Sequence, residues 1–169
     1  MVPAMPRELA NLRRSAGRLR NPWKIGVEHL ERLPDGACIL AVNRVGPFDH
    51  LNVMASLGRT ATLVLEPQNR RRMIPGLRHV SWDDQSDAER SPAARLARGE
   101  ILVVFPEGAS DGDGVVHKGH ARFVALALST GVTIVPAALV PLKAREALPE
   151  FRYRLRIGEV IDTTRFAGD

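Results

Sequence analysis

Several classes of protein are excluded by what this sequence has little of. Cys38 is the only cysteine among 169 residues, so an internal disulfide framework and a cysteine-rich zinc site are both excluded. Because Cys38 lies in the apolar run 37–42, we expect a buried core thiol rather than a nucleophile. Aromatic residues make up 5% of the chain. Trp23 is the only one in residues 1–24, so the N-terminus lacks the aromatic series on which single-stranded nucleic acids stack.

The charge of the chain is distributed unevenly. The formal net charge is +5, from 24 basic and 19 acidic residues. Residues 1–24 contain six basic residues and one acidic residue, and the remaining 145 residues contain eighteen of each sign. A neutral body argues against a nucleic-acid-binding domain, which usually carries a basic face on the fold itself. With 44% hydrophobic residues, the chain suits one domain with a core. We therefore predict a basic amphipathic arm, residues 1–24, and one α/β domain, residues 25–169.

Long uninterrupted apolar runs are also missing. The N-terminus has no apolar run of the length that a signal peptide needs. Residues 123–142 form the longest uncharged stretch, and their number alone would allow a membrane span. Gly131, Pro136 and Pro141 interrupt this stretch, so we predict a helix that ends at Gly131 and a buried strand 132–135 instead. The expected location is cytoplasmic, with peripheral attachment at the inner face of the membrane as an alternative.

Short apolar runs alternate with segments long enough for crossover helices. This order predicts an α/β fold with a mixed, mainly parallel sheet flanked by helices. The expected strands are 37–42, 60–65, 101–105, 132–135 and 151–157. The expected helices are 6–20, 50–58, 86–98 and 119–130.

Polar residues follow two of these predicted strands directly. After the first strand, Gly46-Pro47 indicates a turn, and Asp49 has either a role in the site or only that of an N-cap for the next helix. After the strand 101–105, Glu107 lies where α/β folds place ligands, and the alternative is a turn glutamate in solvent.

A third polar segment, residues 117–121, opens the predicted helix 119–130. A helix N-terminus attracts anions, and Lys118 adds a positive charge there. The alternative is a solvated helix start without a ligand.

Taken together and in this order, these segments resemble the glycerolipid acyltransferase family, typified by lysophosphatidate acyltransferases. The resemblance begins at residues 26–30, which are similar to the family's Gly-x-Glu-Asn lead-in, and continues through residues 43–49, where the family has Asn-His-x4-Asp. Phe105-Pro106-Glu107-Gly108 matches its Phe-Pro-Glu-Gly core. His117-Lys118-Gly119 resembles its Lys-x-Gly step, and Ile134-Val135-Pro136 its Val-Pro strand motif.

The resemblance implies an acyl transfer. In the family, a histidine takes the proton from a hydroxyl of the acceptor, usually a lysophospholipid, and the aspartate five residues later orients that histidine. The hydroxyl then attacks the thioester of acyl-CoA or acyl carrier protein, which is the co-substrate, and no further cofactor or metal is implied. The Phe-Pro-Glu-Gly segment helps to shape the acceptor site. We therefore expect Phe105, Pro106, Glu107, Gly108 and Lys118 to bind substrate.

This sequence departs from the family at the base. The histidine position is Arg44, and a guanidinium stays protonated and does not serve as a base. Asp49 then has no histidine to orient, and Arg44 is available to pair with it. The family's second-motif arginine is also missing, since residues 78–83 offer an acid there. Ala109-Ser110 replaces the Thr-Arg that usually follows Phe-Pro-Glu-Gly.

Three interpretations follow from this departure. In the first, the base has been relocated to His50, or to His117 or His120, and Asp49 still contributes to catalysis. In the second, the protein is a catalytically inactive relative that binds an acyl chain, a thioester or a lipid headgroup, with Arg44 as an anion-binding or structural residue. In the third, catalysis needs no full base, because the enzyme orients the reactants and an amine acceptor supplies its own nucleophile.

The arm has its own expected partners. Residues 7–20 have the pattern of a basic interfacial helix, which would bind an anionic membrane surface or an acidic acyl carrier protein. The alternative is a helix that packs on the body with its arginines in water. A nucleic-acid partner is the least favoured.

Overall fold

The structure is a computed structural model that describes residues 25–46, 48–57, 59–66, 77–83, 91–108, 118–142 and 153–166. The predicted arm 1–24, with its helix and its expected partners, lies outside these ranges. His117 lies outside them too. These parts of the sequence analysis therefore stay predictions.

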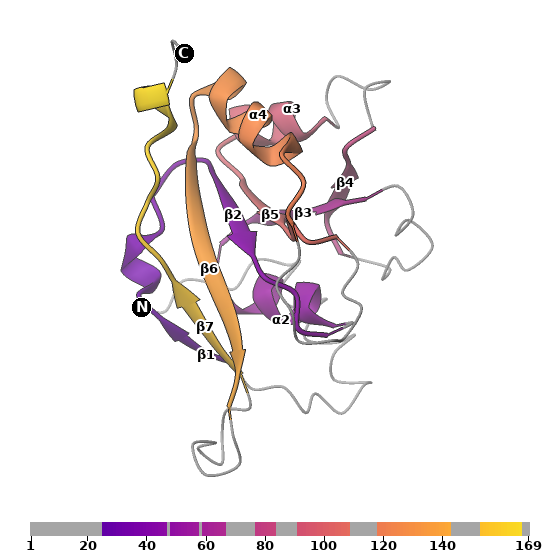
Figure 1. Cartoon of the computed structure of the whole chain (residues 1–169), viewed down its shortest axis with the longest axis vertical. Coiled ribbons are helices and arrows are strands. Elements are labelled where there is room, and N and C mark those ends of the chain that lie inside the picture. Colours follow the sequence, from indigo (N-terminus) through magenta and orange to yellow (C-terminus); the bar gives the residue numbers. More distant parts are fainter. Residues whose placement is uncertain are drawn as a thin grey trace, which may run out of the picture.

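The described strands form one seven-stranded sheet in the order β1-β7-β6-β2-β5-β3-β4 (Figure 1). Every neighbouring pair is parallel except β6 and β7, which are antiparallel. The prediction of a mixed, mainly parallel sheet is confirmed. The strands are β1 (Ile25–Glu28), β2 (Cys38–Val42), β3 (Ala61–Leu65), β4 (His79–Ser81), β5 (Ile101–Val104), β6 (Thr133–Pro141) and β7 (Tyr153–Ile157).

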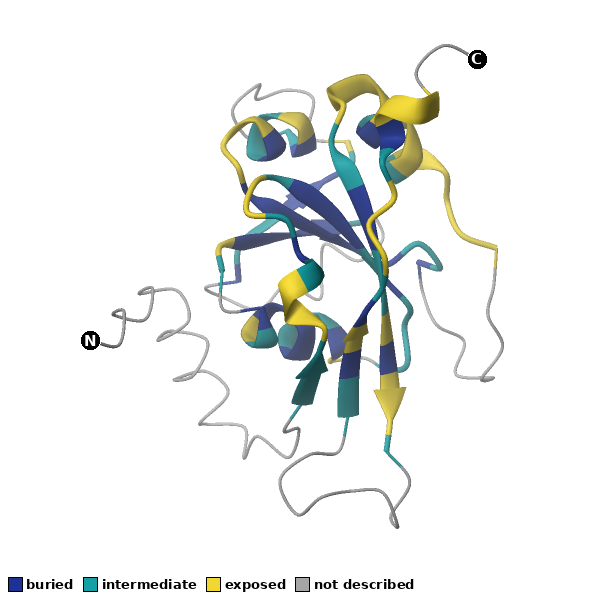
Figure 2. Ribbon diagram, turned by 90° about the vertical axis from the view of Figure 1, so that its left-hand side faces the viewer, coloured by how far each residue is buried: buried dark blue, intermediate teal, exposed yellow. Residues whose placement is uncertain are grey.

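Helices cover both faces of the sheet, as Figure 2 shows. One core lies under α2 (Asp49–Ser56) and includes Val53 with Leu40 and Val103 of the central strands. The other lies under α3 (Pro92–Ala97) and α4 (Arg122–Thr130), where Leu96 and Ala127 pack with Ile39 and Leu102. Alternate residues of β2 and β5 therefore enter opposite cores, which explains why both strands are continuously apolar. Two 3-10 helices, η1 (Leu30–Arg32) and η3 (Thr163–Phe166), complete the described elements.

The long uncharged stretch divides as its breakers predict. α4 ends at Thr130, and Gly131 takes a left-handed conformation with φ 68°, as glycine commonly does after a helix. β6 then starts at Thr133, but it runs to Pro141 rather than ending at Val135. Within the described ranges, no helix is both long and apolar enough to cross a membrane.

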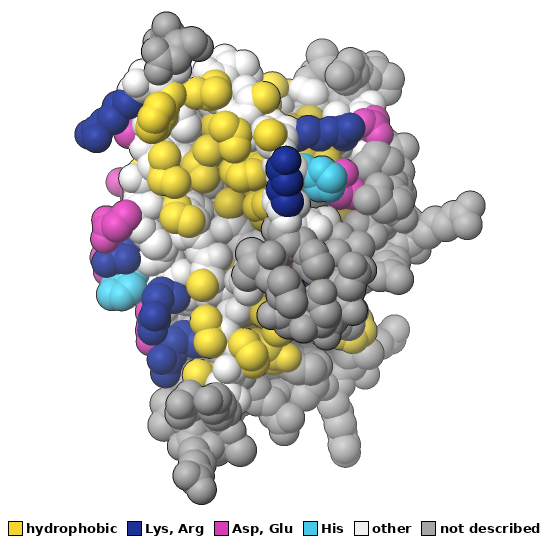
Figure 3. Space-filling view, in the orientation of Figure 1, with side chains coloured by type: hydrophobic (Ala, Val, Ile, Leu, Met, Phe, Trp, Pro, Cys, Tyr) yellow, Lys and Arg dark blue, Asp and Glu magenta, His cyan; other side chains and the backbone are white. Residues whose placement is uncertain are grey.

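Apolar side chains also gather on the outer surface over α4, β6 and the segment that leads to η3 (Figure 3). Val124 and Leu128 of α4 are more than a third exposed, and Phe166 of η3 is 57% exposed.

At the β1 edge of the sheet, the carboxylate oxygens of Glu28 lie 2.9 Å from the Nε atoms of Arg154 and Arg156 of β7. The basic face of β7 is therefore neutralised in part by its neighbouring strand.

The single cysteine should react very slowly with thiol reagents in the folded protein. Cys38 has no exposed surface, and burial raises the pKa of its thiol to about 11. Since the thiolate is the reactive form, we expect 5,5′-dithiobis(2-nitrobenzoate) at pH 8 to label the native chain at least roughly 100-fold more slowly than the urea-unfolded chain. Labelling of the native protein at the unfolded rate would contradict this placement of Cys38 in the core.

Candidate active site

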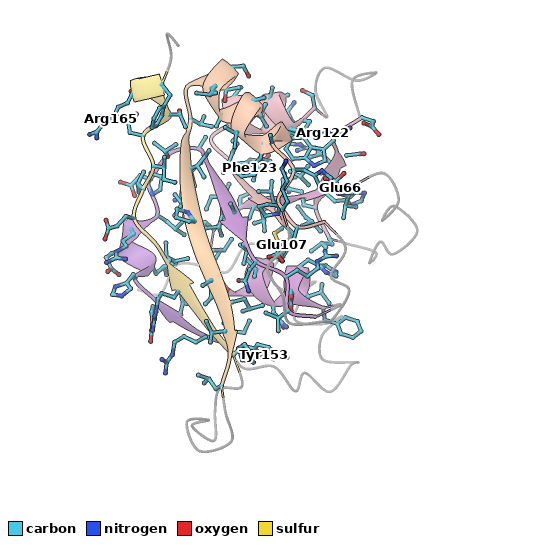
Figure 4. All side chains as sticks on the ribbon, viewed as in Figure 1. Glu66, Glu107, Arg122, Phe123, Tyr153 and Arg165 are labelled. Atoms are coloured by element: carbon cyan, nitrogen blue, oxygen red, sulfur yellow. The ribbon has the colours of Figure 1, made fainter. Side chains whose placement is uncertain are left out.

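A cleft opens at the carboxyl ends of the neighbouring parallel strands β2, β5, β3 and β4. Ligands of α/β folds bind at this edge, because strand ends and loops meet there. Figure 4 shows that Glu66, Glu107 and Phe123, from three separate segments, lie in this region. The residues that line the cleft are Arg44, Val64, Leu65, Glu66, Trp82, Val104, Phe105, Pro106, Gly108, His120 and Phe123.

Asp49 closes the turn between β2 and α2. Its Oδ2 accepts hydrogen bonds from the backbone N–H groups of Val45, at 2.5 Å, and Gly46, at 2.7 Å. The interpretation of Asp49 as an N-cap is wrong, because Asp49 is the first helical residue and Phe48 occupies the cap position. Burial raises the pKa of the Asp49 carboxyl, and the two N–H groups and the charge of Arg44 oppose that rise.

Arg44 connects the segment after β2 to the Phe105–Gly108 turn. Its backbone N–H donates to Oε1 of Glu107 at 3.4 Å. Its guanidinium carbon lies 4.9 Å from the centroid of the Phe105 ring, which is within the range of a cation–π contact. Arg44 therefore presents a permanent positive charge at the cleft.

Asn43, the other polar residue after β2, has a structural role. Its side-chain Oδ1 accepts the backbone N–H of Leu139 at 2.6 Å, and its Nδ2 donates to the carbonyl of the same residue at 3.1 Å. The amide thus continues the pairing of β2 with β6 for one position beyond the strand. This fixes the direction in which the chain leaves β2 toward Arg44.

The Phe105–Gly108 turn and residues 119–120 pack directly against each other. Gly108 has φ 70° and donates its N–H to the carbonyl of Phe105 at 3.0 Å, which closes the turn after β5. The backbone N–H of His120 donates to the carbonyl of Pro106 at 2.9 Å. A Cβ at Gly119 would lie 2.9 Å from the Cβ of Pro106, so this close approach requires glycine.

The relocated-base candidate His50 lies on α2 and is not among the residues that line the cleft. Burial lowers the pKa of its imidazole to about 4, and the charge of Arg44 adds to this effect. His50 is thus neutral near pH 7. Its basicity is also low, which makes it a poor general base.

The neutral His50 makes the fold sensitive to acid. Near pH 6.5 the unfolded chain binds a proton at this histidine that the folded chain refuses until about pH 4, so folded-state stability falls as the pH drops between these values. We expect His50 to account for about 2 kcal/mol of lost stability at pH 5. Urea unfolding at pH 7 and pH 5 should show a smaller difference for His50→Gln than for the wild type.

The comparison with the variant is needed because Asp49 changes the stability of the fold in the opposite direction as the pH falls. Its raised pKa means that the folded chain holds a proton more readily than the unfolded chain near pH 4. His29→Gln, at an exposed position, is the matched control and should keep the wild-type difference. An equal pH dependence in wild type and His50→Gln would contradict the partly buried, neutral state of His50.

Only some of the other predicted site residues line the cleft. Phe105, Pro106 and Gly108 line the cleft, whereas Glu107 is held by the backbone of Arg44 and Lys118 is exposed outside the lining.

Six lining residues were not predicted as site residues, namely Val64, Leu65, Glu66, Trp82, Val104 and Phe123. Glu66 and Trp82 directly follow β3 and β4. The rule that pointed to Glu107, a polar residue after a buried strand, also applied to Glu66.

Comparison with known proteins agrees with this geometry. The family model Acyltransferase matches residues 24–140. The crystal structure of the 1-acyl-sn-glycerophosphate (LPA) acyltransferase PlsC from Thermotoga maritima superposes with a TM-score of 0.68 and 23% sequence identity, over 95% of this chain and 71% of that chain. No curated protein matches the chain. The chain therefore belongs to the acyltransferase family, as the resemblance indicated, and it has the fold of PlsC.

Proposed function

We propose that this chain transfers a fatty acyl group from acyl-CoA or acyl carrier protein to the hydroxyl of a lysophospholipid-type acceptor. The observation that carries the proposal is the cleft itself, in which the Phe105–Gly108 turn, one permanent cation and an apolar wall meet at the carboxyl edge of the sheet. The similar protein from Thermotoga maritima is a 1-acyl-sn-glycerophosphate acyltransferase. That likeness supports the acceptor class proposed for this chain.

The wall of the cleft suits the apolar part of the substrates. Val64, Leu65 and Trp82 come from the ends of β3 and β4, and Phe123 comes from α4. Apolar walls with a few placed polar groups are typical of small-molecule sites. In this proposal the walls bury the first methylene groups of the acyl chain, next to the thioester.

Arg44 suits the anionic part of the acceptor. A guanidinium binds phosphate oxygens through paired N–H donors, and it keeps its charge at every working pH. The contact with the Phe105 ring holds the guanidinium at the cleft. Arg44 would therefore take part of the role of the phosphate-binding arginines that the family has elsewhere.

A second candidate function is binding without transfer. It is favoured by the state of Asp49, whose Oδ2 is occupied by two backbone N–H groups, and by the arginine at the base position. In that case the cleft would hold a thioester or an anionic lipid and leave it unchanged.

A turnover assay separates the two candidates. The purified chain is incubated with palmitoyl-CoA and lysophosphatidate, and free thiol is followed with time. Acyl transfer predicts thiol release that depends on lysophosphatidate. Retained binding of palmitoyl-CoA without any release of thiol would support the binding function and contradict transfer.

A further inference from the structure

We propose that His120 is the general base of this acyltransferase, in place of the histidine that the family carries at the position of Arg44. The inference rests on the proposed acyl transfer. It assigns the proton-accepting role to a residue just before α4. Three observations lead to it: the positions of the described histidines, the packing of residues 119–120 against the Phe105–Gly108 turn, and the accessibility of His120 in the cleft.

The first observation is that His120 is the only one of the four described histidines that lines the cleft. His29 lies beside η1, with its Nδ1 3.4 Å from Oε1 of Glu31. His79 lies at the start of β4, with its Nδ1 2.9 Å from the carbonyl oxygen of Leu77. His50 is partly buried on α2 outside the lining. A general base must reach the proton that it removes, so position selects His120 among the described histidines.

The second observation is that the fold fixes His120 against the Phe105–Gly108 turn. Its backbone N–H is bonded to the carbonyl of Pro106, and the contact of Gly119 with Pro106 leaves no room for another residue there. A Cβ at Gly108 would lie 3.6 Å from Nε2 of His120. The imidazole therefore lies over the one residue of the turn that has no side chain, and its backbone is held by that turn.

The third observation is that the imidazole shares the cleft with a cation and remains accessible. His120 is exposed, and Arg44 lines the same cleft with its guanidinium over Phe105. An acceptor whose anionic group binds Arg44 would place a hydroxyl of its glycerol backbone elsewhere in the cleft. Arg44 then binds the charge, and His120 receives the proton.

The proposed step is balanced within the substrates and this side chain. A neutral imidazole nitrogen of His120 accepts the hydroxyl proton while the oxygen attacks the thioester carbonyl carbon. The carbon–oxygen bond of the ester forms, and the carbon–sulfur bond breaks. The thiolate leaves and takes the proton back from the imidazolium, which restores neutral His120.

The test compares His120→Gln with the wild type in the palmitoyl-CoA and lysophosphatidate assay. General-base catalysis contributes roughly 100- to 10,000-fold to rate, so kcat should fall by such a factor while KM for lysophosphatidate stays within about threefold of the wild-type value. His29→Gln should retain wild-type kcat. The acid limb of the wild-type pH–rate profile should be absent from the residual activity of His120→Gln, a change that a structural role would not produce.

A second variant keeps the test decisive if His120→Gln folds poorly. Imidazole added to His120→Ala should restore part of the rate, because a free imidazole can occupy the vacated space beside Gly108. A folded His120→Gln with wild-type kcat, or a His120→Ala that imidazole does not rescue, would overturn the assignment of His120 and leave the proposed acyl transfer standing. Absence of turnover in the wild type would instead overturn the proposed function, and with it this assignment.

Discussion

Glu100→Ala is expected to lower the free energy of unfolding by about 3–5 kcal/mol, because it removes the acceptor at the centre of a buried charge network. Only 8% of the Glu100 side chain is exposed. Its Oε1 lies 3.2 Å from Nη1 of Arg78 and 3.3 Å from Nη1 of Arg95, and its Oε2 accepts the hydroxyl of Thr62 at 2.5 Å. This network joins α3 to the amino ends of β3, β4 and β5.

The size of the effect follows from what the substitution leaves behind. Arg95 is 16% exposed in its side chain, and a guanidinium that loses its carboxylate in such a place keeps its desolvation cost without compensation. Urea unfolding monitored by circular dichroism measures the loss. The matched control is Glu159→Ala, whose 84% exposed carboxylate pairs with Arg32 and should cost less than about 1 kcal/mol. Equal losses in both variants would contradict the assigned importance of the network.

Arg44→Gln is expected to raise KM for lysophosphatidate roughly 10- to 100-fold, because a charge-assisted hydrogen bond contributes about 1.5–3 kcal/mol to binding. The loss should be much smaller with an uncharged acceptor such as monoacylglycerol, since the lost interaction is with the phosphate. Steady-state kinetics with both acceptors provide the measurement. Arg44→Lys should recover part of the affinity, because it restores the charge without the planar group that lies over Phe105.

The control for this prediction lies far from the cleft. Arg165 of η3 pairs with Asp162, its side chain is 79% exposed, and it lies away from Glu66, Glu107 and Phe123 in Figure 4. Arg165→Gln should leave KM unchanged. A rise in KM that is equal for both acceptors would show that Arg44 only maintains the shape of the cleft.

Three of the predicted strands, β2, β3 and β5, are recognised from runs of consecutive apolar residues. β2, β3 and β5 have packing on both faces, so they consist of apolar runs that end where the structure ends them within one residue. β1 and β4 were not predicted. They are edge strands of four and three residues, and pairing with β7 and β3 forms them rather than a pattern of their own.

The length of β6 shows the same limit. Pro136 and Pro141 indicated an early end, but the strand continues because β7 pairs with it from Ala137 to Pro141. A proline lacks only its own N–H donor, and it is tolerated where that donor is not needed. Tertiary pairing therefore overrides the local signal.

The order of strands and polar segments along the chain predicts which segments meet at the cleft, but it does not predict which histidine is the proposed base. Strand ends placed the Phe105–Gly108 turn and Arg44 at one edge of the sheet, as expected for parallel strands. The selection of His120 over His50 depends on the close approach of Gly119 to Pro106, beside which His120 lines the cleft. This is a contact between segments distant in sequence, which spacing along the chain does not encode.

The most direct test of acyl transfer in this cleft is the ratio of phospholipid product to released thiol. Wild-type protein is incubated with palmitoyl-CoA carrying a 13C-labelled acyl chain and with lysophosphatidate, and both products are quantified from the same samples. The proposed function predicts one labelled phosphatidate for each thiol released. Thiol release with labelled free palmitate and no labelled phosphatidate, or no thiol release at all, would contradict it.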